Sequence, residues 1–180
     1  MKSRVSKVAL HRGLDVLLES LPNIIQKFSD VNVVLLGDGP EMEKLQNIVK
    51  EKHLENNVEF RGWINRNDLP EQISGASISI GPLKRTVVTE NALPIKVLEY
   101  MASSLPILAI SGTLPEDVLV HEKNGYFVKD SKELGKRICE LLDSPKLIKS
   151  MGNESLKMVQ KFSWEGIVAD ILKSFESVKN

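Results

Sequence analysis

The sequence has almost no cysteine, no excess of either charge and no long hydrophobic run. Its 180 residues include one cysteine, Cys139, so no disulfide framework can form and a reducing, cytoplasmic location is expected. Lysine plus arginine and aspartate plus glutamate number 24 each, which makes the formal net charge zero. This balance gives no electrostatic reason to expect nucleic acid as a partner.

No apolar run approaches the roughly 18 residues that a membrane-spanning helix needs. The basic start MKSRVSKVALHRG lacks the apolar core of a signal peptide. The three histidines form no constellation with a serine or cysteine nucleophile, and no acidic pair indicates a metal. We therefore expect neither a bound metal nor a cofactor.

The chain alternates between short apolar runs and longer stretches of helical spacing. This alternation predicts an α/β fold, a Rossmann-like parallel sheet flanked by helices on both faces, in a single domain over residues 1–180. RVSKVAL is a weak opening strand, and Pro22 is expected to kink or break the first helix. We expect strands at 31–37, 58–60, 77–81, 106–110 and 125–128, a loop at 82–92, and helices at 13–28, 40–52, 65–76, 93–104, 130–144, about 145–160 and 163–178.

In such sheets, ligands bind where the carboxyl ends of strands meet helix N-termini. In LLGDGPEMEKL, Gly37 and Gly39 allow a tight turn and half-match the dinucleotide fingerprint, but Met42 occupies the place of its third glycine. A plain strand–turn–helix connection is the alternative to an NAD site. In FRGW, Gly62 is consistent either with a capped turn or with a backbone contact to a planar base.

The stretch TENALPIKVLEYMASSLPILAI raises the question of what an acid inside a largely buried helix meets. If that helix begins near Ala92, Leu93 or Pro94, its free N–H groups form an anion site, and Lys96 adds a positive charge. Glu99 lies three residues after Lys96 and shares its face. A phosphate at the helix start would place a ribose diol beside Glu99, whose carboxylate accepts two hydrogen bonds. The alternative is that Glu99 only pairs with a cation.

The order of several short motifs resembles a known family. GDGP, FRGW, PxKxxEYMA followed by SLPILA, NGYFV and FSWE occur in the order typical of the C-terminal half of group 1 (family 4) glycosyltransferases of the GT-B fold. The resemblance runs from about Arg4 to Phe175. It implies a domain that binds a nucleotide-diphosphate sugar.

The resemblance also implies roles for single residues. Glu99 matches the second glutamate of a paired-glutamate motif and would hold the ribose of the donor. The first glutamate normally lies eight positions earlier, where Asn91 stands here, so the neighbouring Glu90 is assigned to the transferred sugar. Ile64 matches a position whose backbone approaches the base, and Ser104 stands where the family has glycine.

Two further cations follow from the resemblance. Arg4 and Arg12 stand nearest to an arginine and a lysine that contact the diphosphate, although arginine replaces the lysine and their separation is wider than usual. Together with Lys96 and the helix start, they would stabilise the charge on the departing diphosphate.

The expected function is retaining transfer of a hexose in polysaccharide, glycolipid or glycoconjugate synthesis. An N-terminal domain that binds the acceptor would be missing, so this chain should bind donor but transfer little or nothing alone. Association with the inner face of the membrane through that missing half stays open. The alternatives are a non-catalytic interaction module, an NAD-dependent oxidoreductase domain and, less favoured, a sugar epimerase.

Overall fold

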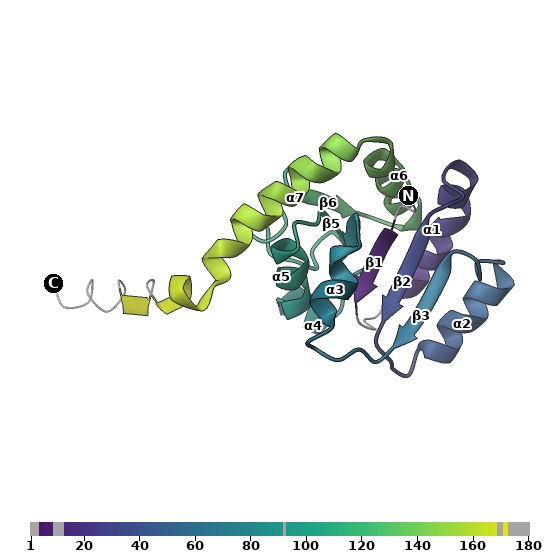
Figure 1. The fold of residues 1–180 in the computed structure, drawn as a ribbon, viewed down its shortest axis with the longest axis horizontal. Coiled ribbons are helices and arrows are strands. Elements are labelled where there is room, and N and C mark those ends of the chain that lie inside the picture. The colour runs from purple at the N-terminus through teal and green to yellow at the C-terminus, as the bar shows by residue number, and fades with distance from the viewer. Residues whose placement is uncertain (1–3, 9–12, 92, 169–170, 173–180) are drawn as a thin grey trace.

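A six-stranded parallel sheet forms the centre of the protein, whose computed structural model describes residues 4–8, 13–91, 93–168 and 171–172; of residues 4–8 and 91 it describes the backbone alone (Figure 1). The strand order is β3-β2-β1-β4-β5-β6. The predicted fold class is thereby confirmed. The strands are β1 (Arg4–Val8), β2 (Asn32–Leu36), β3 (Val58–Gly62), β4 (Ile78–Ile80), β5 (Ile107–Ile110) and β6 (Gly125–Val128).

The opening strand, weak in sequence, lies at the centre of this sheet. Residue 5 of β1 is in register with Val33 of β2 on one side and with Ile78 of β4 on the other. The strand order therefore reverses direction between β1 and β4. In open α/β sheets, the crevice at such a reversal is where ligands bind.

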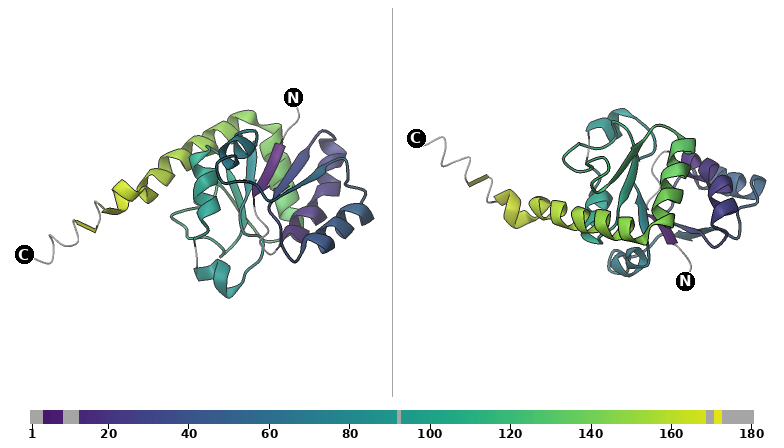
Figure 2. Two further views of the ribbon diagram at one scale, coloured as in Figure 1. Left: turned by 60° about the horizontal axis from the view of Figure 1, so that its bottom comes forward. Right: turned by 90° about the horizontal axis from the view of Figure 1, so that it is seen from above.

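Helices cover both faces of the sheet (Figures 1 and 2). One core cluster joins the strands to α1, α2 and α6, whereas α3 and α5 pack on the opposite face, and α7 packs along α5. No helix in the described ranges has the length and apolar character needed to span a membrane. The helices are α1 (Leu14–Lys27), α2 (Met42–Glu51), α3 (Leu69–Ser74), α4 (Val87–Asn91), α5 (Ile95–Ala102), α6 (Ser131–Asp143), α7 (Pro145–Val159) and the 3₁₀ turn η1 (Gln160–Phe162).

The expected break at Pro22 does not occur, because α1 continues through this residue to Lys27. The helix buries a stripe of apolar side chains at helical spacing, which include Leu14, Leu17 and Leu21. Its packing against α6 and the sheet compensates for the hydrogen bond that proline cannot donate.

The segment 82–92, predicted as a loop, contains the short helix α4. The sequence did not predict this helix. Thr86 and Thr89 cap it reciprocally: the amide of Thr89 donates to Oγ1 of Thr86 at 3.1 Å, and the amide of Thr86 donates to Oγ1 of Thr89 at 2.8 Å. This arrangement is a capping box with threonine in the place of the usual glutamate.

The end of α5 shows the backbone conformation of Ser104, the position where the family that the sequence resembles has glycine. The amide of Ser104 donates to the carbonyl of Met101, and the amide of Leu105 donates to the carbonyl of Tyr100, each at 3.1 Å. These two bonds form a Schellman motif, which places Ser104 in the left-handed region at φ 56°. Glycine adopts that conformation at no steric cost, so the departure at Ser104 affects the backbone.

A modified capping box begins α6. The carboxylate of Asp130 accepts from the amide of Glu133 at 2.8 Å, and the carboxylate of Glu133 accepts from the amide of Lys129 rather than from that of Asp130. The predicted helix at 65–76 is shorter than expected, since α3 begins at Leu69 and ends at Ser74.

Candidate functional site

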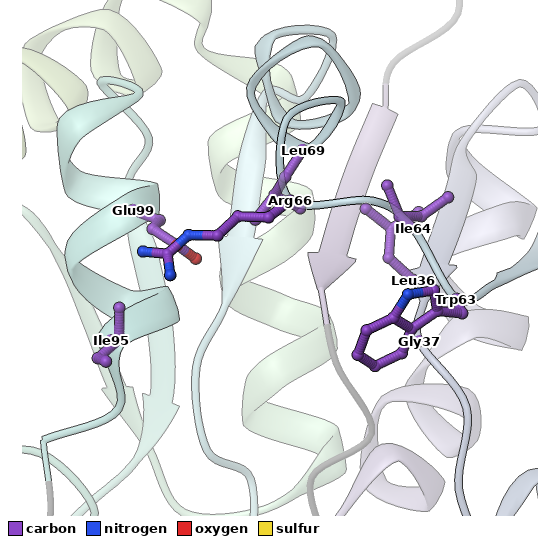
Figure 3. Close-up of a pocket in the computed structure, with 8 residues that line it drawn as sticks. All are labelled: Leu36, Gly37, Trp63, Ile64, Arg66, Leu69, Ile95 and Glu99. Atoms are coloured by element: carbon purple, nitrogen blue, oxygen red, sulfur yellow. The ribbon is translucent and has the colours of Figure 1, made fainter.

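A cavity of about 400 Å³ opens at the carboxyl edge of the sheet (Figure 3). Its walls come from the end of β2, the segment after β3, the start of α3 and the first half of α5. The cavity therefore bridges the two halves of the sheet at the point where the strand order reverses. It is lined by Leu36, Gly37, Trp63, Ile64, Arg66, Leu69, Ile95 and Glu99.

Glu99 lines this cavity and is half-buried. No ion pair or hydrogen bond joins its carboxylate to another described residue, Lys96 included. The alternative that Glu99 merely pairs with a cation is not what the described residues show. Because α5 begins at Ile95 with Pro94 as its N-cap, Glu99 stands about 6 Å along the axis from the first helical residue. This is slightly closer to the helix start than the sequence suggested.

The rest of the cavity combines an apolar wall with a cationic side chain. Leu36, Ile64 and Leu69 contribute carbon surface. Trp63 stands at the rim with 85% of its surface exposed, rather than in the core. The exposed guanidinium of Arg66 extends across the opening toward Glu99 (Figure 3). Such a cavity can hold a flat, partly apolar ring beside groups that donate and accept hydrogen bonds.

Arg66 is a residue of the cavity that no pattern in the sequence indicates. This residue lies in a polar segment, and no local spacing relates it to α5. Tertiary folding brings Arg66 toward Glu99, because β3 ends and α5 begins at the same edge of the sheet.

Two glycines connect the ends of β2 and β3 below this cavity. The amide of Gly37 donates to the carbonyl of Gly62 at 2.6 Å, and both residues have positive φ, at 114° and 63°. The amide of Gly39 donates to the carboxylate of Asp38 at 2.7 Å. Neither Gly39 nor Gly62 lines the cavity, so their assignment to the donor site stays a prediction.

Lys96 occupies the first turn of α5 and is 7% exposed. Its ammonium nitrogen is buried and has no hydrogen-bond partner among the described residues. Burial alone lowers the pKa of Lys96 to about 7. The lysine expected to present a positive charge at the helix start therefore lies inside the protein, in a place where its charge is costly.

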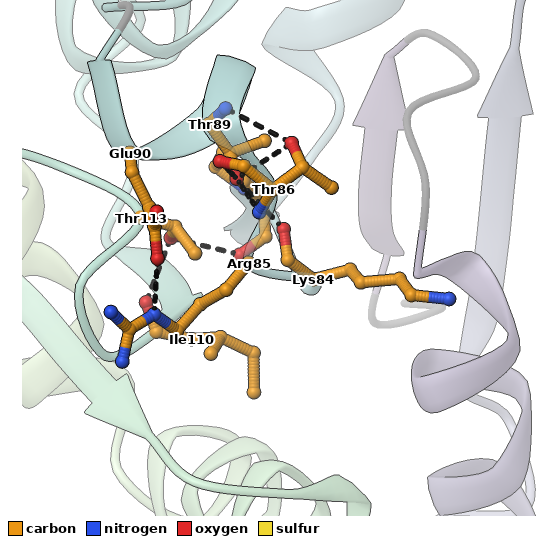
Figure 4. A network of polar contacts seen from close by, with 8 residues as sticks. Lys84, Arg85, Thr86, Thr89, Glu90, Ile110 and Thr113 are labelled. Atoms are coloured by element: carbon orange, nitrogen blue, oxygen red, sulfur yellow. Dashed lines mark hydrogen bonds and ion pairs between the residues drawn. The ribbon is translucent and has the colours of Figure 1, made fainter.

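Glu90 lies outside the cavity, on α4. Its carboxylate accepts a hydrogen bond from Nε of Arg85 at 2.7 Å, next to the threonine caps of that helix (Figure 4). Leu93 is half-buried and packs against the core cluster that contains Val97. The structure thus brings Ile64 and Glu99 together at one cavity but places Glu90 and Leu93 elsewhere.

The remaining predicted site residues are described only in part. Arg4 begins the central strand β1, and Asn91 ends α4, but their side chains are not among the described ones. Arg12 and Ala92 lie outside the described residues. The roles assigned to these four residues stay predictions.

The glycine turn is misplaced for an NAD site. In the dinucleotide-binding fold, the fingerprint follows the first strand of the unit, whereas Gly37 and Gly39 follow β2. The fingerprint is followed about twenty residues later by an acid, and Glu59 has that spacing here. Its carboxylate, however, accepts a hydrogen bond from Nε of Arg61 on β3 at 2.8 Å. Both observations weigh against the oxidoreductase alternative.

Comparison with known families agrees with this geometry. A model of the glycosyl transferases group 1 matches residues 4–158, which is most of the chain. The chain belongs to this family. Group 1 glycosyltransferases with the GT-B fold are also its structural neighbours, and the chain corresponds to their C-terminal domain.

A curated relative supports the membership, and a solved structure supports the fold. An uncharacterized glycosyltransferase of Haemophilus influenzae is 31% identical over 164 residues, which are 89% of this chain and 44% of that protein. A GDP-Man:Man(3)GlcNAc(2)-PP-Dol alpha-1,2-mannosyltransferase of Dictyostelium discoideum is 28% identical, over 94% of this chain and 34% of its own length.

The crystal structure of Anabaena Alr3699/HepE in complex with UDP and glucose superimposes with a TM-score of 0.82 at 19% identity. That match covers 98% of this chain and 49% of the other. The chain thus spans between about a third and a half of the length of these three proteins.

Proposed function

We propose that this chain is the donor-binding half of a glycosyltransferase that takes its sugar from a nucleoside-diphosphate sugar. The observation that carries the proposal is Glu99: a half-buried carboxylate with no partner among the described residues, facing a cavity at the reversal point of the sheet. A buried acid that is left without a cation costs folding free energy unless a ligand uses it. Hydroxyl donors are the groups that a carboxylate accepts.

The cavity suits the nucleoside part of such a donor. In the proposed pose, the ribose diol donates to Glu99, while the base lies against the apolar surface of Leu36, Ile64 and Leu69. Trp63 at the rim offers an aromatic face to the base. Arg66, a donor-only side chain, is placed to reach acceptor atoms of the ligand. HepE was crystallised with UDP and the Dictyostelium relative is named for GDP-mannose, so both bases are candidates here.

In the same pose, the diphosphate lies at the start of α5. Free amide groups and the partial positive charge of a helix N-terminus favour anions there. Lys96 lies in the first turn, and Arg4 and Arg12 are the further cations that the family pattern provides. As the bond to the sugar breaks, negative charge grows on the diphosphate, and cations fixed in place stabilise it.

The proposed reaction is transfer of a hexose with retention at the anomeric carbon, as the family pattern implies. Glu90 and Asn91 are the proposed contacts of the transferred sugar. The proposal requires a second, N-terminal domain for the acceptor, which agrees with the greater length of the matched proteins. The nucleotide sugar is itself the activated donor, so the proposal includes no further cofactor.

Binding is the direct test. UDP-, GDP- and ADP-sugars are titrated into the chain by isothermal calorimetry, and the best ligand is then tested on Glu99→Ala. We expect that variant to bind about 10- to 100-fold more weakly, because hydrogen bonds to a charged group contribute about 1–3 kcal/mol. Glu116→Ala is the matched control, since Glu116 is an exposed acid outside the cavity.

The outcomes separate the alternatives. Equal affinity of Glu99→Ala and the parent chain would remove Glu99 from the site. Absence of binding to every nucleotide sugar, with the complete protein tested alongside, would favour the non-catalytic interaction module.

A further inference from the structure

Lys96 is unusual among the described lysines because its entire charged group is buried and unsatisfied. Nε of Arg137 is the other buried donor without a partner among the described residues, but Nη1 of that guanidinium donates to Glu140 at 2.8 Å. Lys96 has no such compensation. Burial of an unpaired ammonium costs several kcal/mol, so a function must explain why a lysine stands here.

The position of Lys96 on α5 relates it to the cavity. Successive helical residues are rotated by about 100°. Ile95 and Glu99 face the cavity, whereas Val97 packs into the core cluster on the other side. Lys96 lies on the helix between these two faces. Lys96 stands in the first turn of α5, which is the helix start where the proposed diphosphate lies.

The charged groups around α5 do not pair with Lys96. β5, which packs against this helix, carries no charge, and the carboxylate of Glu154 on α7 is hydrogen-bonded to Lys157 at 2.6 Å. On the α4 side, Arg85 and Glu90 pair with each other. On the cavity side, Glu99 and Arg66 form no ion pair with Lys96.

The described residues therefore leave the ammonium without an anion. Burial lowers the pKa of this lysine to about 7, and no neighbouring charge opposes the effect. We therefore expect a large fraction of Lys96 to be neutral at neutral pH when no anion is bound.

We infer that Lys96 is a proton-coupled binding residue for the donor's diphosphate, one that takes up a proton from solvent as the anion arrives. The inference rests on the proposed function, which places the diphosphate at the start of α5. Phosphate oxygens supply both the acceptors and the negative charge that the described residues lack, so the bound state favours the ammonium form. An exposed lysine, charged at all times, would bind the same anion without taking up a proton.

The test is calorimetry of the chain with its best nucleotide sugar, in two buffers of different ionisation enthalpy, at pH 6 and pH 8. The phosphates of a nucleotide sugar are esterified at both ends, so the ligand lacks the ionisation near pH 6 that a monophosphate has. We expect uptake of about 0.9 proton per ligand at pH 8 and about 0.1 at pH 6, with affinity about tenfold weaker at pH 8.

Variants assign the proton to Lys96. Lys96→Met is expected to bind more weakly, with no proton uptake and no change of affinity between the two pH values. Lys149→Met is the matched control, because Lys149 is an exposed helical lysine on α7 and its loss should leave the uptake unchanged.

A second measurement needs no substitution. With lysine side chains labelled with carbon-13 at Cε, nuclear magnetic resonance of the empty chain should show one lysine that titrates near pH 7. Saturation with the nucleotide sugar should move that titration to higher pH.

Four results would overturn the inference. Binding with no proton uptake at pH 8, or uptake that persists in Lys96→Met, would reject the coupling and leave the proposed function intact. Titration of every lysine near pH 10 in the empty chain would reject it in the same way. Failure of all nucleotide sugars to bind would reject the proposed function, and this inference with it.

Discussion

Replacing Lys96 by methionine should stabilise the folded chain at neutral pH. Methionine has a similar length and fills the same space, but it removes the cost of burying an amine. Burial lowers the pKa of Lys96 from 10.5 to about 7. Because each pKa unit corresponds to about 1.4 kcal/mol, this lysine reduces the free energy of unfolding by about 4 kcal/mol at pH 7.

The dependence on pH gives the sharper signature. The unfolded chain keeps the Lys96 proton up to about pH 10.5 and the folded chain only up to about pH 7, so the unfolded state binds more protons between these values. The contribution of Lys96 to stability therefore improves as the pH rises through that window. The advantage of Lys96→Met should shrink by about 1.4 kcal/mol per pH unit and vanish near pH 10.5.

The assay is urea denaturation followed by circular dichroism at pH 7, 8, 9 and 10, on the parent chain and on Lys96→Met. Lys149→Met serves again as the control, since an exposed substitution should change the free energy of unfolding by less than about 0.5 kcal/mol at each pH. Parallel stability profiles for the parent chain and Lys96→Met would refute the reasoning, because they would show that the lysine keeps its proton on folding.

Two further predictions concern the backbone at the end of α5 and the packing of α7 against it. Ser104→Gly should raise the free energy of unfolding in urea by about 1 kcal/mol, because Ser104 has φ 56°, whereas Ser104→Ala keeps the Cβ and should give no gain. Gly152→Ala should lower it by about 3 kcal/mol, because the new Cβ would stand 2.0 Å from the carbonyl oxygen of Ser104. Gly135→Ala is the control for Gly152→Ala. The new Cβ at position 135 would stand 3.5 Å from its nearest atoms, so we expect no loss of stability. A similar loss in both variants would contradict the packing argument.

The site was predictable where one local pattern contained the relevant residues. The spacing within α5 indicated that Lys96 and Glu99 lie near a helix start, and the sequence stretch FRGW placed Ile64 after a strand. Both Ile64 and Glu99 line the cavity. Neither the exposure of Trp63 nor the approach of Arg66 to Glu99 has a local signal, because they depend on how β3 and α5 meet.

The errors in the predicted elements have the same origin. Proline lowers the intrinsic stability of a helix, so Pro22 suggested a break, but the buried stripe of α1 packs against the core strongly enough to keep the helix continuous. The short helix α4 was missed because its cap pairs Thr86 with Thr89 instead of with an acid. Local propensity gave way to packing in the first case and to an uncommon cap in the second.

By itself, the sequence determined the parallel α/β fold, since continuous apolar strands alternating with amphipathic helices can bury their surfaces only in layers. It also determined that an acid follows a lysine on one helix. Only the tertiary structure decided that Glu99 faces a cavity and that the Lys96 ammonium is buried, each with no partner in the part of the chain that the structure describes. The physical reason is that periodicity fixes which side of a helix a residue occupies, whereas solvation and pairing depend on segments brought there from elsewhere in the chain.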